Sequence, residues 1–100
     1  YWNIQYEPVH KGSDTSLIES IRDKIVESVK SCKTNLRDSS FLSGGTDSTS
    51  ITSILSSISD SKVKSYSIGF YEEEYSELEF VDIAQQKLKH ISNKYKLSAD

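Results

Sequence analysis

Apolar side chains recur at steps of three and four residues over about residues 15–33, which is the spacing of one face of an α-helix. The positions with this spacing are Leu17, Ile18, Ile21, Ile25, Val26, Val29 and Cys32. Ser13 or Asp14 can cap the helix, because a short side-chain oxygen there accepts a hydrogen bond from a free backbone N–H. We therefore predict an amphipathic helix with one buried stripe, in which Cys32 is a small core residue.

Two further helical patterns alternate with short extended segments along the rest of the chain. Helices are expected at about residues 47–59 and 80–91, and strands at residues 39–42, 63–70 and 94–97. Strands that alternate with helices of this length imply right-handed crossover connections and a parallel sheet. The pattern predicts an α/β fold, a three-layer parallel sheet with flanking helices, of which this chain would be a partial domain.

A glycine turn joins the first expected strand to the helix that follows it. The sequence from Phe41 to Thr49 reads Phe-Leu-Ser-Gly-Gly-Thr-Asp-Ser-Thr. A helix N-terminus presents free N–H groups and the positive end of the helix dipole, so it attracts phosphate. Gly44 and Gly45 let the backbone approach an anion without a Cβ atom in the way. The turn lacks the spacing of a Walker A loop, but we expect it to bind phosphate or pyrophosphate.

Side chains around this turn add to the expected anion site. Ser43, Ser48 and Thr49 supply hydroxyl donors, and Asp47 offers a hard oxygen ligand for Mg²⁺. A further glycine, Gly69, comes near the end of the second expected strand. Because ligands of parallel α/β sheets bind beyond the carboxyl ends of the strands, the two glycine-bearing ends predict a nucleotide crevice.

Composition narrows the classes of partner. The 100 residues carry a net charge of −3, with no stripe of Lys and Arg between aromatic residues, so nucleic acid is not expected as a partner. No apolar run approaches the ~20 residues of a membrane span, so no membrane contact is expected. The single cysteine excludes an internal disulfide and fits a reducing compartment, which favours a cytoplasmic location.

Three segments, taken in order, carry a resemblance to a known family. They are the glycine turn, the strand end Ser67-Ile68-Gly69-Phe70 and the helix start Tyr75-Ser76-Glu77. With these segments the chain resembles the synthetase domain of glutamine-hydrolysing asparagine synthetase, within the ATP pyrophosphatase (PP-loop) group. The turn alone is shared with GMP, NAD and argininosuccinate synthetases, whereas its combination with Ser-Ile-Gly-Phe is more specific. The resemblance implies an adenine nucleotide alpha hydrolase-like fold.

The resemblance also implies how the chain is divided. Residues 1–13 would be a linker from a preceding domain, and residues 14–100 the N-terminal part of an asparagine synthetase-like ATP-binding domain. The sequence contains no methionine and begins Tyr1-Trp2, from which we expect an internal piece of a longer protein.

The implied activity is that of an ATP-dependent carbon–nitrogen ligase with ATP and Mg²⁺ bound. In the family, the side-chain carboxylate of aspartate attacks the α-phosphorus of ATP, pyrophosphate leaves, and ammonia displaces AMP. The substrate would be aspartate or a similar carboxylate, and the ammonia would come from a glutaminase domain not present here. The resemblance leaves open whether the protein forms a homodimer. The residues implied at the phosphates are Ser43, Gly44, Gly45, Asp47 and Ser48, with Asp47 toward Mg²⁺. Those implied near the adenine are Phe41, Leu42 and Ile68, and Gly69 is implied as a further residue of the nucleotide site.

Three alternatives remain open from the sequence. The chain could belong to a related amide-forming or lactam-forming enzyme, because the substrate-binding half is missing. It could also be a nucleotide-binding module that catalyses nothing, or an interaction fragment with an empty loop. In each case we expect the isolated chain to bind nucleotide poorly and to be inactive.

Overall fold

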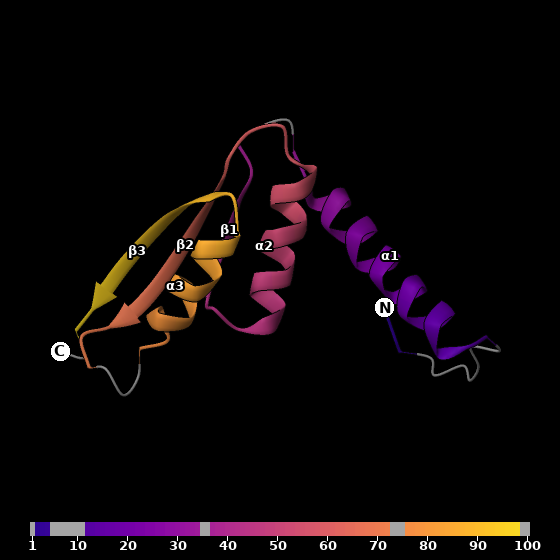
Figure 1. Ribbon diagram of the computed structural model, residues 1–100, viewed down its shortest axis with the longest axis horizontal. Coiled ribbons are helices and arrows are strands. Elements are labelled where there is room, and N and C mark those ends of the chain that lie inside the picture. Colours follow the sequence, from indigo (N-terminus) through magenta and orange to yellow (C-terminus); the bar gives the residue numbers. More distant parts are fainter. Residues whose placement is uncertain (1, 5–11, 35–36, 73–75, 99–100) are drawn as a thin grey trace.

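The computed structural model describes residues 2–4, 12–34, 37–72 and 76–98 (Figure 1). Three strands form one parallel sheet in the order β1-β2-β3. The elements in chain order are α1 (Asp14–Cys32), β1 (Ser39–Phe41), α2 (Thr46–Ile58), β2 (Val63–Phe70), α3 (Leu78–Lys87) and β3 (His90–Leu97). The predicted α/β class, with a parallel sheet and flanking helices, is confirmed. Most of the predicted linker over residues 1–13 lies outside the described residues.

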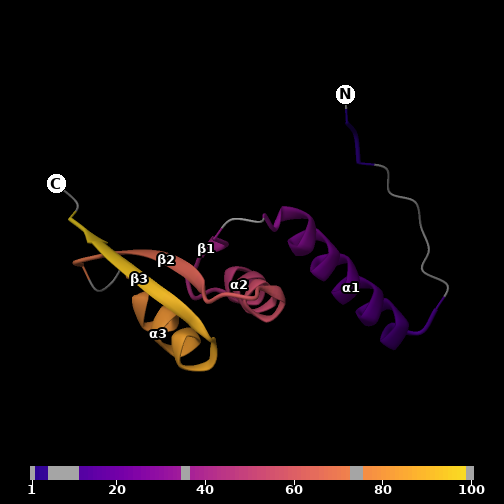
Figure 2. The same cartoon turned by 90° about the horizontal axis from the view of Figure 1, so that it is seen from above.

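Helices α2 and α3 lie against the same face of the sheet. Every second residue of β2 from Val63 to Gly69 is buried, so these positions share one face. Leu55 of α2 clusters with Val63, and a Cβ on Gly69 would lie 2.5 Å from Leu78 of α3. Figure 2 shows α3 on one side of the sheet. The described residues therefore form the sheet and one helical layer packed against it.

Small side chains let α2 and α3 approach the sheet closely. Buried Thr52 of α2 donates to the Ser48 carbonyl at 2.7 Å and lies 3.0 Å from the Ser40 hydroxyl of β1. This contact holds a serine-rich helix whose intrinsic propensity is low. The apolar core consists of two small clusters: Leu42, Leu78, Val81 and Ala84 in one, and Val29, Leu55 and Val63 in the other.

The opposite face of the sheet carries apolar side chains that no helix of the described ranges covers. Ile68 of β2 and its register partner Tyr95 of β3 are 57% and 56% exposed. The other members of this open face are Ser39 and Phe41 on β1, Lys64, Tyr66 and Phe70 on β2, and Ile91, Asn93 and Leu97 on β3.

Helix α1 begins where the sequence predicts but does not bury its apolar stripe. Ser13 caps it, accepting from the Ser16 N–H at 3.3 Å. Val29 is its one buried residue, whereas Ile18 is 66% exposed and Cys32 is exposed too. The predictions of a buried stripe and of a core cysteine are therefore wrong for this structure. The physical reason is that α1 packs on α2 near the C-terminal end of α1, whereas the N-terminal part of α1 lies away from α2 (Figure 1).

The third helix is shorter, and the third strand longer, than the sequence pattern predicts. Helix α3 ends at Lys87, and the Leu88 N–H closes it by donating to the Ala84 carbonyl at 3.0 Å. Ile91, predicted as helical, lies in β3 and pairs with Lys64. Ile91 fits a helical step from Leu88 and also begins an alternating pattern, and the eight-residue β2 provides a partner for every residue of β3.

Helix α3 begins about two residues earlier than predicted, and the remaining boundaries agree with the prediction to within about one residue. Strand β2 is confirmed at both ends, and α2 begins one residue early, at Thr46. Strand β1 ends at Phe41, although the next N–H, that of Leu42, still donates to the Tyr66 carbonyl at 2.9 Å. No helix in the described part of the chain has the length and hydropathy needed to cross a membrane.

Candidate functional site

The turn between β1 and α2 depends on Gly44. Its φ is +89°, in the left-handed region that other residues rarely adopt. A Cβ atom at this position would lie 2.5 Å from the Phe80 Cβ and 2.8 Å from the Val81 nitrogen, both in α3. Gly44 is therefore explained by turn geometry and by close packing on α3.

Gly45 has no such structural reason to be glycine. It is the N-cap residue of α2, with an ordinary φ of −68°. A Cβ atom there would meet one neighbour within 4 Å, the Ser43 hydroxyl oxygen at 3.4 Å. The space beside Gly45, over the first turn of α2, is therefore open to a ligand.

The two serines of the turn bond to each other and to Gly45. The Gly45 N–H donates to Ser43 Oγ at 3.3 Å, and the Ser43 N–H donates to Ser48 Oγ at 3.2 Å. Ser48 Oγ donates to the Gly45 carbonyl at 3.2 Å and lies 3.0 Å from Ser43 Oγ. The residues predicted at the phosphates are thus brought together in one hydrogen-bonded loop.

Several main-chain donors in this loop remain free. The first helical N–H with an acceptor is that of Thr49, which donates to the Gly45 carbonyl at 3.1 Å. Within the described residues, the N–H groups of Gly44, Thr46, Asp47 and Ser48 have no acceptor. Free N–H groups at a helix N-terminus carry partial positive charge, so this corner of the sheet suits an anion.

Asp47 and Thr49 are placed differently around this corner. Asp47 is exposed in the first turn of α2, where its carboxylate faces solvent. No group of three or more His, Cys, Asp or Glu residues that could hold a metal occurs in the described ranges. The Thr49 hydroxyl oxygen is buried and has no partner in this part of the structure.

The residues predicted near adenine do not all lie on one surface. Phe41 is 78% exposed and pairs with Tyr66, and Ile68 is two residues further along the same face of β2. Leu42 is buried in the core instead, where its N–H donates to Tyr66 and its carbonyl accepts from Ser67. Phe41 and Ile68 therefore form an exposed apolar surface near the loop.

Gly69 and Ser67 act through packing and tethering in this structure. Gly69 is buried, and a Cβ atom there would lie 2.5 Å from Leu78 and 2.8 Å from the Ser76 hydroxyl. Ser67, which the sequence reasoning missed, donates from its buried hydroxyl to the Leu42 carbonyl at 2.6 Å. The run of small residues at alternate β2 positions was the signal that could have indicated this close approach.

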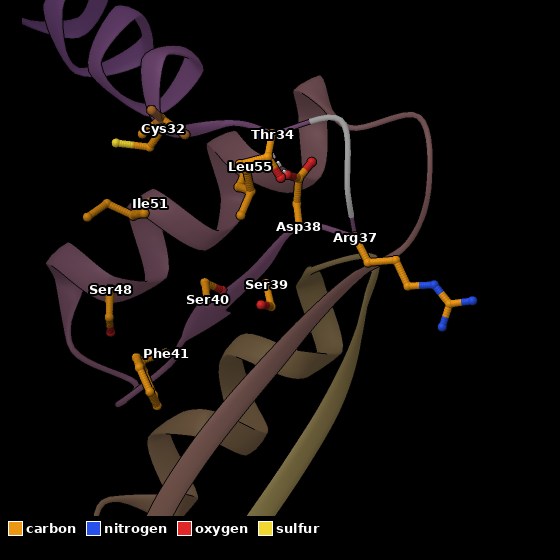
Figure 3. Close-up of a pocket in the computed structure, with 11 residues that line it drawn as sticks. Cys32, Thr34, Arg37, Asp38, Ser39, Ser40, Phe41, Ser48, Ile51 and Leu55 are labelled. Atoms are coloured by element: carbon orange, nitrogen blue, oxygen red, sulfur yellow. Dashed lines mark hydrogen bonds between the residues drawn. The ribbon is translucent and has the colours of Figure 1, made fainter.

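A cavity of about 570 Å³ lies beside β1, between the C-terminal end of α1 and α2 (Figure 3). Phe41 and Ser48 line it, so the cavity reaches the glycine turn. Asp38 closes its other end, accepting from the Thr34 N–H at 3.3 Å and from the Ser59 hydroxyl at 2.9 Å. Figure 3 shows the Arg37 side chain extending away from these residues.

The parallel sheet, the flanking helices and the glycine turn after β1 define an α/β domain of the nucleotide hydrolase-like type. Residues 20–100 match the asparagine synthase family, and the chain belongs to that family. It is 34% identical over 87 residues to asparagine synthetase (glutamine-hydrolyzing) 1 of Bacillus subtilis (strain 168). The match covers 86% of this chain and 13% of that relative, so the chain spans a small part of the relative's length.

Proposed function

We propose that this chain is the ATP-binding portion of an asparagine synthetase that uses glutamine as its nitrogen source. The observation that supports this most is the cluster of four free N–H groups between β1 and α2, in a chain of the asparagine synthase family. A triphosphate is the ligand that such a cluster would recognise, because its oxygens are anionic acceptors.

The proposed nucleotide pose follows from the geometry of the loop. The phosphates would lie against residues 43–48, where Gly45 leaves open space beside the free N–H groups. The adenine ring would lie on the exposed apolar surface of Phe41 and Ile68. Leu42 and Gly69 would support these positions from the core side.

Asp47 fits the expected magnesium ion. Mg²⁺ in nucleotide sites is commonly held by one or two carboxylates together with substrate phosphates and water, so the exposed carboxylate beside the loop suits one of these ligand positions. The ion would neutralise phosphate charge when bound.

The proposed reaction activates a carboxylate. A side-chain oxygen of aspartate forms a bond to the α-phosphorus of ATP, and the bond from that phosphorus to pyrophosphate breaks. Ammonia, released from glutamine elsewhere in the protein, then attacks the activated carboxyl carbon. AMP leaves, and the amide is formed. The loop N–H groups would stabilise the charge that grows on the departing pyrophosphate. Loss of one such donor typically raises a barrier by about 3 kcal/mol.

Aspartate-dependent exchange of labelled pyrophosphate into ATP by the full-length protein tests this proposal. The Gly45→Val variant places a branched side chain in the open space and is expected to lower the exchange rate about 100-fold. Gly12→Val, the same change at an exposed glycine just before α1, is the matched control and should leave exchange unchanged. Circular dichroism of both variants would check that they remain folded.

The outcomes separate the alternatives. Exchange that requires another acid would assign a related amide-forming or lactam-forming ligase. Saturable Mg-ATP binding by calorimetry without any exchange would indicate a nucleotide-binding module that does not catalyse. A folded protein that neither binds nor exchanges would contradict the proposed function.

A further inference from the structure

Three basic residues that are far apart in the sequence are aligned at the amino ends of the three strands. Continued two positions before Ser39, the register of β1 on β2 places Arg37 opposite Lys62. Continued one position before Val63, the register of β2 on β3 places Lys62 opposite Lys89. Neighbouring strands lie about 4.8 Å apart, so the three residues form a row about 10 Å long. We call Arg37, Lys62 and Lys89 the basic row.

The positive charge of the basic row is not neutralised by the described residues. All three side chains are exposed, and none takes part in a salt bridge within the described ranges. Asp38, the acid next to Arg37 in the sequence, already accepts from the Thr34 N–H and from the Ser59 hydroxyl. Figure 3 shows the Arg37 side chain extending away from Asp38. The row is therefore open to an anionic ligand.

Helix ends explain the basic row only in part. The C-terminal carbonyls of α2 and α3 favour nearby cations, and Lys62 and Lys89 each follow one of these helices. Asp60 and Lys87, the other charged residues at these two ends, have opposite signs and leave the excess positive charge unchanged. Arg37 comes five positions after the last residue of α1, which is beyond the last turn where the helix dipole acts. Its alignment with the two lysines thus has no explanation in the fold.

The place and spacing of the basic row indicate the kind of ligand. The row lies at the amino ends of the strands, whereas the glycine turn follows the carboxyl end of β1, so the two surfaces are separate (Figure 1). An extended peptide advances about 3.3 Å per residue, so three or four successive acidic residues would cover the row. Carboxylates form charge-assisted hydrogen bonds with Arg and Lys. A nucleic acid is disfavoured because the row has no aromatic side chain for base stacking and the chain carries a net charge of −3.

We propose that the basic row binds an acidic segment of a partner protein, one with three or four successive Asp or Glu residues. This inference is independent of the proposed function, because the ligand does not occupy the glycine turn and no step of the reaction is involved.

Fluorescence anisotropy of labelled hexaglutamate, titrated with the full-length protein at low ionic strength, tests the proposal. Saturable binding that weakens as salt is added is expected. Arg37→Gln combined with Lys62→Gln should weaken binding about tenfold, and Lys89→Gln alone about threefold. The matched control, Arg22→Gln with Lys30→Gln, removes the same charge from exposed positions of α1 and should stay within about twofold of the original protein. Equal weakening by the two pairs, or no saturable binding at all, would overturn the proposal.

Two competition experiments identify the surface and the class of ligand. Saturating Mg-ATP should leave hexaglutamate binding unchanged, whereas displacement of the peptide would place it at the glycine turn and contradict the proposal. An oligothymidylate of equal charge should bind more weakly than hexaglutamate. Tighter binding of the oligonucleotide would assign the row to nucleic acid and overturn the proposed partner. Circular dichroism of the variants checks that each remains folded.

Discussion

Gly44 and Gly45 are neighbours in the loop, yet different forces act at the two positions. Gly44 has a positive φ and contacts the backbone of α3, whereas Gly45 has an ordinary φ and faces open space. The fold explains a glycine at position 44, whereas only the proposed function would explain one at the adjacent position 45. This difference allows the two positions to be tested with the same substitution.

Alanine at each glycine should change stability very differently. Gly44→Ala forces a strained φ and a contact with Phe80, and it is expected to lower the free energy of unfolding by about 2–4 kcal/mol. Gly45→Ala should cost about 1 kcal/mol or less, since it affects only the helix cap. Urea denaturation of the two variants measures the difference. Equal losses of unfolding free energy would contradict the positive φ and the close packing at Gly44.

Two buried serines of β2 provide a second matched pair. Ser67 donates to the Leu42 carbonyl, whereas the hydroxyl of Ser65, which is fully buried, has no partner among the described residues. Ser67→Ala should therefore destabilise the protein by about 1–2 kcal/mol. Ser65→Ala removes an unpaired polar group and should be neutral or stabilising by up to about 1 kcal/mol. Thermal unfolding of both variants checks the order.

At this scale the sequence predicts which residues form the loop, but not how each one acts. The hydroxyls and glycines were recognisable because strand, turn and helix cap follow one another in the chain. Gly69 acts through its contact with Leu78 of α3, and Ser67 acts through its hydrogen bond to Leu42, so both roles depend on contacts between different elements. Such contacts have no local signal beyond the small residues at alternate positions of β2.

At the scale of elements, helix α1 shows how a strong local pattern and burial can disagree. Its spacing and its Ser13 cap predict the helix correctly, because both signals act within one turn of the chain. Burial depends on what lies opposite, and α1 meets α2 near its C-terminal end alone. The boundary between α3 and β3 was missed for a related reason, since pairing with β2 decides the state of Ile91.

Truncation along α1 should report this uneven packing. Val29 is 8% exposed and clusters with Leu55, so Val29→Ala is expected to cost about 1–2 kcal/mol. Ile21 is 51% exposed, so Ile21→Ala should cost about 0.5 kcal/mol or less despite the larger side chain. Chemical denaturation of the 100-residue chain distinguishes the two. A larger cost at Ile21 would mean that the stripe is covered in solution.

At the scale of the whole molecule, the chain exposes more surface than its mass requires. Its accessible surface is 8449 Å², whereas a compact monomer of 11.3 kDa exposes about 5,700 Å². The radius of gyration is 16.8 Å, against about 13 Å for a compact chain of this length. The divergence of α1 and the open face of the sheet both contribute to this difference.

The open face should make the 100-residue chain associate in solution. Exposed apolar patches of this kind drive contact between molecules, so light scattering should show a mass that rises with concentration. Ile68→Lys combined with Tyr95→Lys, which places two charges on the open face, is expected to restore a monomer. The control, Gln85→Lys with Gln86→Lys, adds the same charge to exposed positions of α3. Association that persists in the first variant and disappears in the control would locate the contact elsewhere.

The packing of Leu78 against Gly69 limits how this sequence could have evolved. Leu78, the first residue of α3, fills the space that the missing side chain of Gly69 leaves near the end of β2. A lineage in which position 69 gained a methyl group would have needed a shorter residue at position 78 to remain folded. The two positions should therefore have changed together or not at all. The residue at the end of β2 thus limits which side chains could have been selected in the first turn of α3.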